Sequence, residues 1–362
     1  MAGRWLALLS DSRLGSSNTF IPMAFTLQLD GRRAFVRGLR HLIDIEGGPT
    51  AEQQKVLQTL AQHLLGLSPT AWSQDSPLPP SQLAAAIPDP NDRRRFLQLA
   101  CMLNLCRHPR SEAQLQRLEA FAQALDVQGV ELQVIEELFH RSATEATADF
   151  LRIYAGSMKE LSEHHGGTLT ASGELSYDDA FFEAVAGLGR QPRGSLGWCF
   201  AEFYARNRIA LPSRATPNPG YYVCHDMNHV IAGYEPTGPG EIALGAFKLA
   251  LHDSEANWLA SLTNVLIHEV GLFMHGTDLQ FVPYGGGGEP YHGIDGKRGA
   301  LDLPGAAELL AEALRRGSQC TGDFSMLDHL AIAHVPLVEI RRQYNVLPLA
   351  VPMFDDAEFW PA

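Results

Sequence analysis

Apolar residues recur three and four positions apart along most of this chain, whereas the alternating pattern of a β-strand is scarce. The first spacing gathers apolar side chains on one face of an α-helix. The segment that begins at Thr50 is an example, because Thr50 and Gln53 have the spacing of a capping box and one valine and four leucines follow at helical intervals. Gly66 is placed to end this helix. We therefore predict an all-α fold.

Breaks in the helical pattern suggest how the 362 residues are organised. Residues 1–30 have no clear pattern and are expected to form a loose extension. Short amphipathic helices between short turns predict an N-terminal helical bundle at 31–165. Helical patterns resume after "HHGGTLTASGE" at 164–174, which predicts a C-terminal helical domain at 176–350 with a metal site on a helical hairpin.

Three segments inside these domains carry more specific expectations. The proline-rich stretch 67–92 is predicted to be a linker or an irregular loop, because its prolines interrupt regular structure. The segment 142–161 has the pattern of one more helix of the bundle. The glycine-rich stretch 283–299 lacks the residue order of a phosphate-binding loop, so we predict a loop there, with a lid as the alternative.

Composition narrows the possible partners and the compartment. The formal net charge of −13 argues against nucleic-acid binding, which needs clustered lysine and arginine. Five cysteines, with no CxxC pair, favour a reducing compartment over a disulfide framework, so we expect a cytoplasmic protein. No stretch approaches the roughly 18 apolar residues that cross a bilayer. Peripheral contact with a membrane remains open.

The stretch "HDMNHVIAGYEPTGPGE" at 225–241 contains the strongest candidate site. On a helix that runs from 221 to 233, His225, Asp226 and His229 lie at about 0°, 100° and 40° around the axis, so all three can point to one place. Glu241 cannot come from this helix, because two prolines and two glycines intervene. A tight helical hairpin could return its carboxylate to the histidines.

Imidazole and carboxylate groups are ligands for Zn²⁺, and also for Fe²⁺, Mn²⁺ or Co²⁺. We predict that His225, Asp226, His229 and Glu241 bind such a divalent metal, with zinc as the first choice. No thiolate belongs to the set, which favours a catalytic site with an open position over a structural zinc site. Asp226 is the member best suited to orienting another ligand instead. The plainer alternative is a polar helix face with hydrogen-bonded histidines.

The pattern HDxxH, eleven residues and then Glu resembles the coenzyme Q (ubiquinone) biosynthesis protein 4 family. The flanking "GSLGWCFAEFYARNRIALP", "GEIALGAFKLAL" and "HVPLVEIRRQYNV" are similar to helices of that family, so the resemblance covers roughly 176–350, about half of the chain. One departure lies before the motif. An arginine-flanked tyrosine is expected there, and "GYYVC" offers Tyr221 without the arginines.

The resemblance implies a role in ubiquinone biosynthesis. Its members are linked to the step at ring carbon 1 of a prenylated hydroxybenzoate, where a carboxylate leaves and a hydroxyl enters, and to organising the other enzymes of the pathway. The expected partners are therefore a prenylated aromatic lipid and other ubiquinone biosynthesis enzymes. A homo-oligomer is also expected. Whether the chain is an oxidative decarboxylase or a non-catalytic lipid-binding scaffold stays open.

Two further resemblances were weighed. The segment "RRFLQLACMLNLCRHPRSEAQLQRLEAFAQALDV" is similar to a TerB-like helical module, without that module's acidic metal-binding pair. The His-Asp dipeptide also occurs in HD-type phosphohydrolases, for which His164 or His165 with Asp253 would complete the ligands, so a metal-dependent hydrolase is an alternative. A zinc peptidase is not favoured, because "HEVGL" has Leu272 where the second histidine of HExxH belongs.

Overall fold

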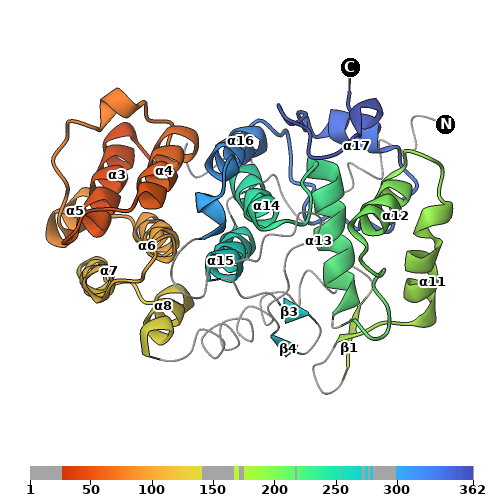
Figure 1. Ribbon diagram of the computed structural model, residues 1–362, viewed down its shortest axis with the longest axis horizontal. Coiled ribbons are helices and arrows are strands. Elements are labelled where there is room, and N and C mark those ends of the chain that lie inside the picture. The colour runs from red at the N-terminus through yellow and green to blue at the C-terminus, as the bar shows by residue number, and fades with distance from the viewer. Residues whose placement is uncertain are drawn as a thin grey trace. The chain divides into compact units, whose positions relative to one another are not determined.

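The computed structural model describes residues 27–140, 167–170, 175–216, 218–252, 254–270, 274–275, 278–279 and 299–361 (Figure 1). These residues divide into two compact units. The first unit contains the described residues of 156–236 and 319–362, and the second contains those of 21–155 and 237–318. Helices dominate both units, which confirms the predicted all-α fold.

The second unit begins with a set of short helices that pack on one another. In chain order they are α3 (Leu29–Ile43), α4 (Ala51–Thr59), the π-helical turn η1 (Leu60–Leu64), the 3-10 turn η2 (Pro69–Ala71), α5 (Pro80–Ala86), α6 (Pro90–Leu105), α7 (Glu112–Leu125) and α8 (Val130–His140). The predicted capping box is present at the start of α4, where Thr50 and Gln53 each accept the other's backbone N–H. Buried aromatic rings hold α3, α6 and α7 together, with Phe96 between Phe35 and Phe121.

The chain then adds three more helices to the same unit. They are α14 (Gly238–Leu251), α15 (Glu255–Val270) and α16 (Ala306–Ser318), accompanied by the antiparallel pair β3 (Met274–His275) and β4 (Asp278–Leu279) and by the 3-10 turn η4 (Ala300–Asp302). Helix α14 packs between α15 and α16, as Figure 1 shows. Helix α15 also packs on α6, and α16 packs on α4 and η1, so the unit has one continuous interior.

The first unit is smaller and holds the candidate site. Its elements are the antiparallel pair β1 (Thr168–Leu169) and β2 (Leu175–Ser176), then α11 (Asp179–Gly187), the 3-10 turn η3 (Leu188–Arg190), α12 (Leu196–Asn207), α13 (Pro219–Ala232), α17 (Leu337–Gln343) and the 3-10 turn η5 (Ala357–Phe359). Helix α13 packs on α12 and on α17. The hydroxyl of Ser195 accepts the N–H of Trp198 at 3.3 Å and caps α12.

The structure departs from one of the expectations for individual segments and leaves others untested. The stretch 67–92 is not wholly irregular, because prolines at the first helical positions start η2 and α5 within it. The expected helix at 142–161 lies outside the described residues, as do residues 1–26 of the expected extension and all of 283–299 except Gly299. The division into domains at 31–165 and 176–350 remains a prediction. Within the described ranges, every helix is too short or too polar to traverse a bilayer.

Candidate metal centre

The motif histidines lie on α13, and local sequence explains where this helix starts and stops. Pro219 occupies the first turn, where its missing N–H costs nothing, so the helix starts two residues before the predicted 221. Gly233 follows the last helical residue with a φ of 84°, a left-handed conformation that favours glycine. The helix therefore carries all three motif residues, as the spacing predicts.

His225, Asp226 and His229 come together on α13. One ligand atom from each of the three lies within 4.8 Å of those of the other two. His229 is fully buried, whereas His225 and Asp226 are half-buried. His229 is thus the inner member of the group, and His225 and Asp226 keep some exposed surface.

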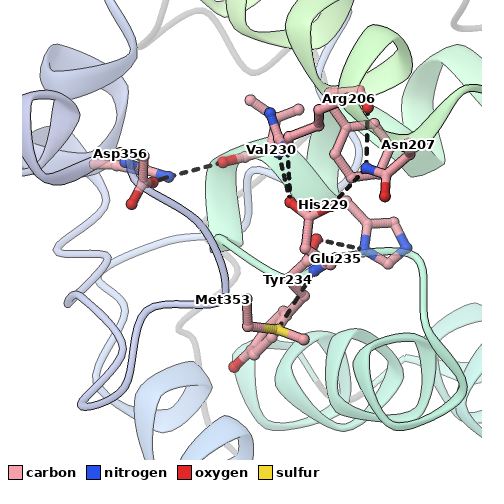
Figure 2. A network of polar contacts seen from close by, with 10 residues as sticks. Arg206, Asn207, His229, Val230, Tyr234, Glu235, Met353 and Asp356 are labelled. Atoms are coloured by element: carbon pink, nitrogen blue, oxygen red, sulfur yellow. Dashed lines mark hydrogen bonds and ion pairs between the residues drawn. The ribbon is translucent and has the colours of Figure 1, made fainter. Parts of the chain in front are cut away.

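The hydrogen bonds of His229 fix which of its nitrogens carries the lone pair. Its Nδ1 lies 3.0 Å from the backbone carbonyl of Tyr234 (Figure 2). A carbonyl can only accept, so Nδ1 carries the hydrogen and Nε2 keeps its lone pair. That Nε2 lies 3.2 Å from Nε2 of His225. The free electron pair of His229 therefore points at the second histidine of the motif.

Two tyrosines contact the other two residues of the motif, His225 and Asp226. The Tyr221 hydroxyl lies 3.3 Å from Nδ1 of His225, and the two rings are stacked with their centroids 5.3 Å apart. The Tyr204 hydroxyl, on α12, donates a hydrogen bond to Oδ2 of Asp226. Tyr221 is the residue that the sequence matched to the tyrosine before the family motif. Its contact with His225 gives that residue a structural role.

A partly buried ion pair anchors the loop that presents the Tyr234 carbonyl. Glu235 follows Tyr234, and its carboxylate accepts hydrogen bonds from Arg206 at 2.9 and 2.6 Å and a further one from Asn207 (Figure 2). The Phe203 ring stacks on the His229 imidazole, with centroids 5.7 Å apart. Helix α12 thus braces His229 through both its ring face and the loop that binds its Nδ1.

The C-terminal end of α13 is closed by Arg341 of α17. Its guanidinium donates to the carbonyls of Ile231 at 3.0 Å and Val230 at 2.9 Å, two of the groups that a helix end leaves without internal partners. The same group pairs with Asp356 at 3.0 Å and lies over the ring of Trp360, 3.3 Å from its centroid. Figure 2 shows Asp356 beside Val230.

The two histidines are arranged as ligands of a shared ion would be. Two nitrogens bound about 2.0–2.1 Å from one tetrahedral Zn²⁺ are separated by about 3.3 Å. The observed separation of 3.2 Å is close to this value, and one lone pair is already directed into the gap. Asp226 adds a carboxylate to the same group. The residues present therefore fit a divalent metal.

The remaining predicted site residues are placed as follows. Glu241 lies in the second unit, in the first turn of α14, where Thr237 caps the helix and Asn264 donates to the Glu241 carbonyl at 2.7 Å. Its part as a fourth ligand stays a prediction. His164, His165 and Asp253, the residues weighed for a hydrolase, lie outside the described residues.

Cys224 precedes the motif but is buried. Its Sγ lies 3.4 Å from the carbonyl of Ser325, which also accepts a hydrogen bond from Asn228 at 3.3 Å. On the other side of Asn228, its Oδ1 is 3.1 Å from Nε2 of His329. These contacts tie the buried face of α13 to the segment before α17. They favour the structural interpretation of Cys224.

Sequence reasoning missed the residues that surround the ligands. Tyr204, Glu235 and Arg341 are far from the motif or have no spacing that marks them. The only indication in the sequence was the type of side chain, since "FYARN" places a tyrosine and an arginine together on an apolar helix. Their partners become evident only when α12, α13 and α17 are placed side by side.

Comparison with known proteins gives little further help. No family model matches the sequence, and no curated protein matches it significantly. Among solved structures, the chain is similar to a crystal structure from Nostoc punctiforme, described as that of a proposed ubiquinone biosynthesis protein. The TM-score is 0.31 and the sequence identity 16%, over 71% of this chain and 99% of that one. A likeness this slight carries no argument.

Proposed function

We propose that this protein binds a divalent metal, Zn²⁺ first among them, through His225, Asp226 and His229. The observation that carries the proposal is the pair of Nε2 atoms that face each other at 3.2 Å, with the His229 tautomer fixed by the Tyr234 carbonyl. In the absence of an ion the two nitrogens share a hydrogen bond, and a divalent ion placed between them would take the place of that hydrogen. Glu241 is proposed as a fourth ligand on the strength of the motif spacing.

The proposed substrate is a prenylated hydroxybenzoate, and its basis is the resemblance of the HDxxH motif and following Glu241 to the ubiquinone biosynthesis family. A bound divalent ion supplies a Lewis acid that polarises a carboxylate or phenolate oxygen. The half-buried sides of His225 and Asp226 leave a direction from which such a headgroup can approach. The proposed reaction breaks the bond from ring carbon 1 to the carboxylate, which leaves as CO2, and forms a bond to a hydroxyl oxygen, while an external oxidant such as O2 accepts the two electrons.

The chain's own residues have definite parts in this proposal. His229 offers a lone pair without having to lose a hydrogen, because its Nδ1–H is donated to Tyr234. Tyr221 positions His225, and Tyr204 positions Asp226. The stacking of Phe203 keeps water from the inner face of the His229 ring. Groups held in this way lose little freedom when an ion binds.

The test is metal analysis of the protein purified without chelators, combined with native mass spectrometry for bound lipid. We expect His229→Ala and His225→Ala each to hold one divalent metal ion per chain fewer than the parent, while circular dichroism stays unchanged. His334→Ala, which removes a half-buried histidine of the same unit outside the motif, is the matched control and should keep the metal. The proposal would be refuted by a parent protein that holds no metal and takes up none on titration.

A second measurement addresses the substrate. The metal-loaded protein is incubated aerobically with a short-chain prenylated hydroxybenzoate, and the decarboxylated, hydroxylated product is sought by mass spectrometry. Product formation that Glu241→Ala abolishes supports the catalytic role. Binding of the compound without turnover indicates the scaffold. The absence of both binding and turnover contradicts the proposed substrate.

A further inference from the structure

A second group of metal-ligand side chains lies in the other unit. Ligand atoms of Glu52, Cys106 and Glu269 all lie within 4.8 Å of one another, and all three residues are buried. They come from α4, from the residue that ends α6, and from α15. These helices pack together in the second unit, so residues distant in sequence converge on one buried position.

The two glutamates differ in how their oxygens are held. Oε1 of Glu269 accepts the N–H of Leu301 at 2.8 Å, and Oε2 lies 3.1 Å from Nε2 of His108. Oε1 of Glu52 is fully buried and has no hydrogen-bond partner among the described residues, although the Glu52 side chain is only 6% exposed. A buried carboxylate oxygen without a partner is costly, so something other than these side chains is expected to bind it.

The backbone at Gly299 also lies close to this group of side chains. Gly299 lies directly before η4, and a Cβ at that position would collide with Oε2 of Glu269 and approach Nε2 of His108 to 2.8 Å. Any larger residue would displace the two side chains. Glycine therefore keeps the space around the carboxylate open for its present contacts.

Placing two carboxylates together in this interior requires a compensating positive charge. Either a hydrogen ion or a metal ion can neutralise such a pair. The Cys106 thiol, which donates to the Met102 carbonyl at 3.2 Å, would give such an ion a soft ligand on losing its hydrogen.

We propose that Glu52, Cys106 and Glu269 form a second metal site, for a divalent cation of the zinc or iron class. A thiolate in the donor set selects such metals over Mg²⁺ and Ca²⁺. His108 positions Glu269, in the way that an outer hydrogen bond orients a metal-binding carboxylate. The site is independent of the one on α13. It joins the N-terminal helices to α15, so its expected role is to stabilise that junction.

Cobalt titration of the metal-free protein tests this proposal, because thiolate bound to Co²⁺ gives an intense near-ultraviolet charge-transfer band. We expect the band in the parent chain and its loss in Cys106→Ser. Cys101→Ser is the matched control, because Cys101 is an equally buried cysteine of α6 outside the group. Parent protein without the band, or Cys106→Ser with an undiminished band, overturns the proposal.

Metal counting by native mass spectrometry separates this site from the one on α13. The parent should bind two ions, and Glu269→Gln and His229→Ala should each bind one, retaining different sites. Glu52→Gln serves as a second variant if Glu269→Gln does not fold. If Glu52→Gln binds as much metal as the parent, the carboxyl pair shares a hydrogen ion and the second site is refuted, whatever the outcome for His229.

Discussion

Tyr204 donates its hydroxyl hydrogen to Oδ2 of Asp226, so a side chain from α12 holds the aspartate of the motif. If Asp226 is a ligand, Tyr204 orients its carboxylate through the hydrogen bond to Oδ2. Removing an outer hydrogen bond of this kind lowers metal affinity by about 10–100-fold in known sites.

Tyr204→Phe is therefore expected to weaken metal binding about tenfold without unfolding the protein, because the ring and its packing remain. Isothermal titration with Zn²⁺ measures the effect. Tyr222→Phe removes a hydroxyl from an exposed ring on α13 and should leave the affinity unchanged. Equal affinities for Tyr204→Phe and the parent would contradict the positioning role of Tyr204.

Glu235→Gln is predicted to weaken metal binding by about 10–100-fold, although Glu235 is not a ligand. Its carboxylate pairs with Arg206 and so holds the loop whose Tyr234 carbonyl sets the His229 tautomer. The tautomer itself can be followed by nitrogen NMR of the imidazole. Glu339→Gln, the same change at an exposed ion pair of α17, is the control. Unaltered imidazole shifts in Glu235→Gln would contradict this account.

Arg341→Met is predicted to destabilise the first unit by about 3–5 kcal/mol, because it leaves Asp356 as a buried charge without its partner. Two carbonyls at the end of α13 also lose their donor. Urea unfolding measures the change. Arg342→Met removes the neighbouring arginine, whose ion pair with Glu339 is exposed, and should cost less than about 0.5 kcal/mol. Similar effects for the two variants would contradict the prediction.

Stability is predicted to fall at alkaline pH through Tyr344. Burial raises the pKa of this phenol from 10.0 to about 12. The folded chain therefore keeps a hydrogen that the unfolded chain releases, so stability is full below about pH 10 and declines as the pH rises toward 12. Between pH 9 and pH 11, Tyr344→Phe should reduce this decline by about 1.3 kcal/mol. Urea unfolding at pH 9 and pH 11 checks it, and the same slope in parent and variant would refute it.

The sequence predicted the helical fold and the local structure of α13 well, because both depend on short-range patterns. Helical spacing of apolar residues, the capping box at Thr50 and the glycine after Ala232 act within a few residues. The same spacing predicted that His225, Asp226 and His229 would share one place. The metal, Glu241 as a ligand, the substrate and membership of the family stay predictions.

These short-range patterns could not predict contacts between segments that lie far apart in the sequence. Nothing near His229 indicated that Arg341 would close its helix, and no spacing joined Glu52 to Glu269. The short helix α5 was missed for the opposite reason, because prolines that interrupt a helix from within can also start one. In each case the sequence showed the chemistry of the side chain, but it did not predict which residue that side chain would contact.

The closure of α13 by Arg341 has a consequence for how the protein is made. The donors for the carbonyls of Val230 and Ile231 lie 111 and 110 residues further along the chain. During synthesis the N-terminal part emerges first, so these carbonyls must remain hydrated until α17 leaves the ribosome. A nascent chain arrested between the two would display the whole histidine motif on a helix whose end is still open.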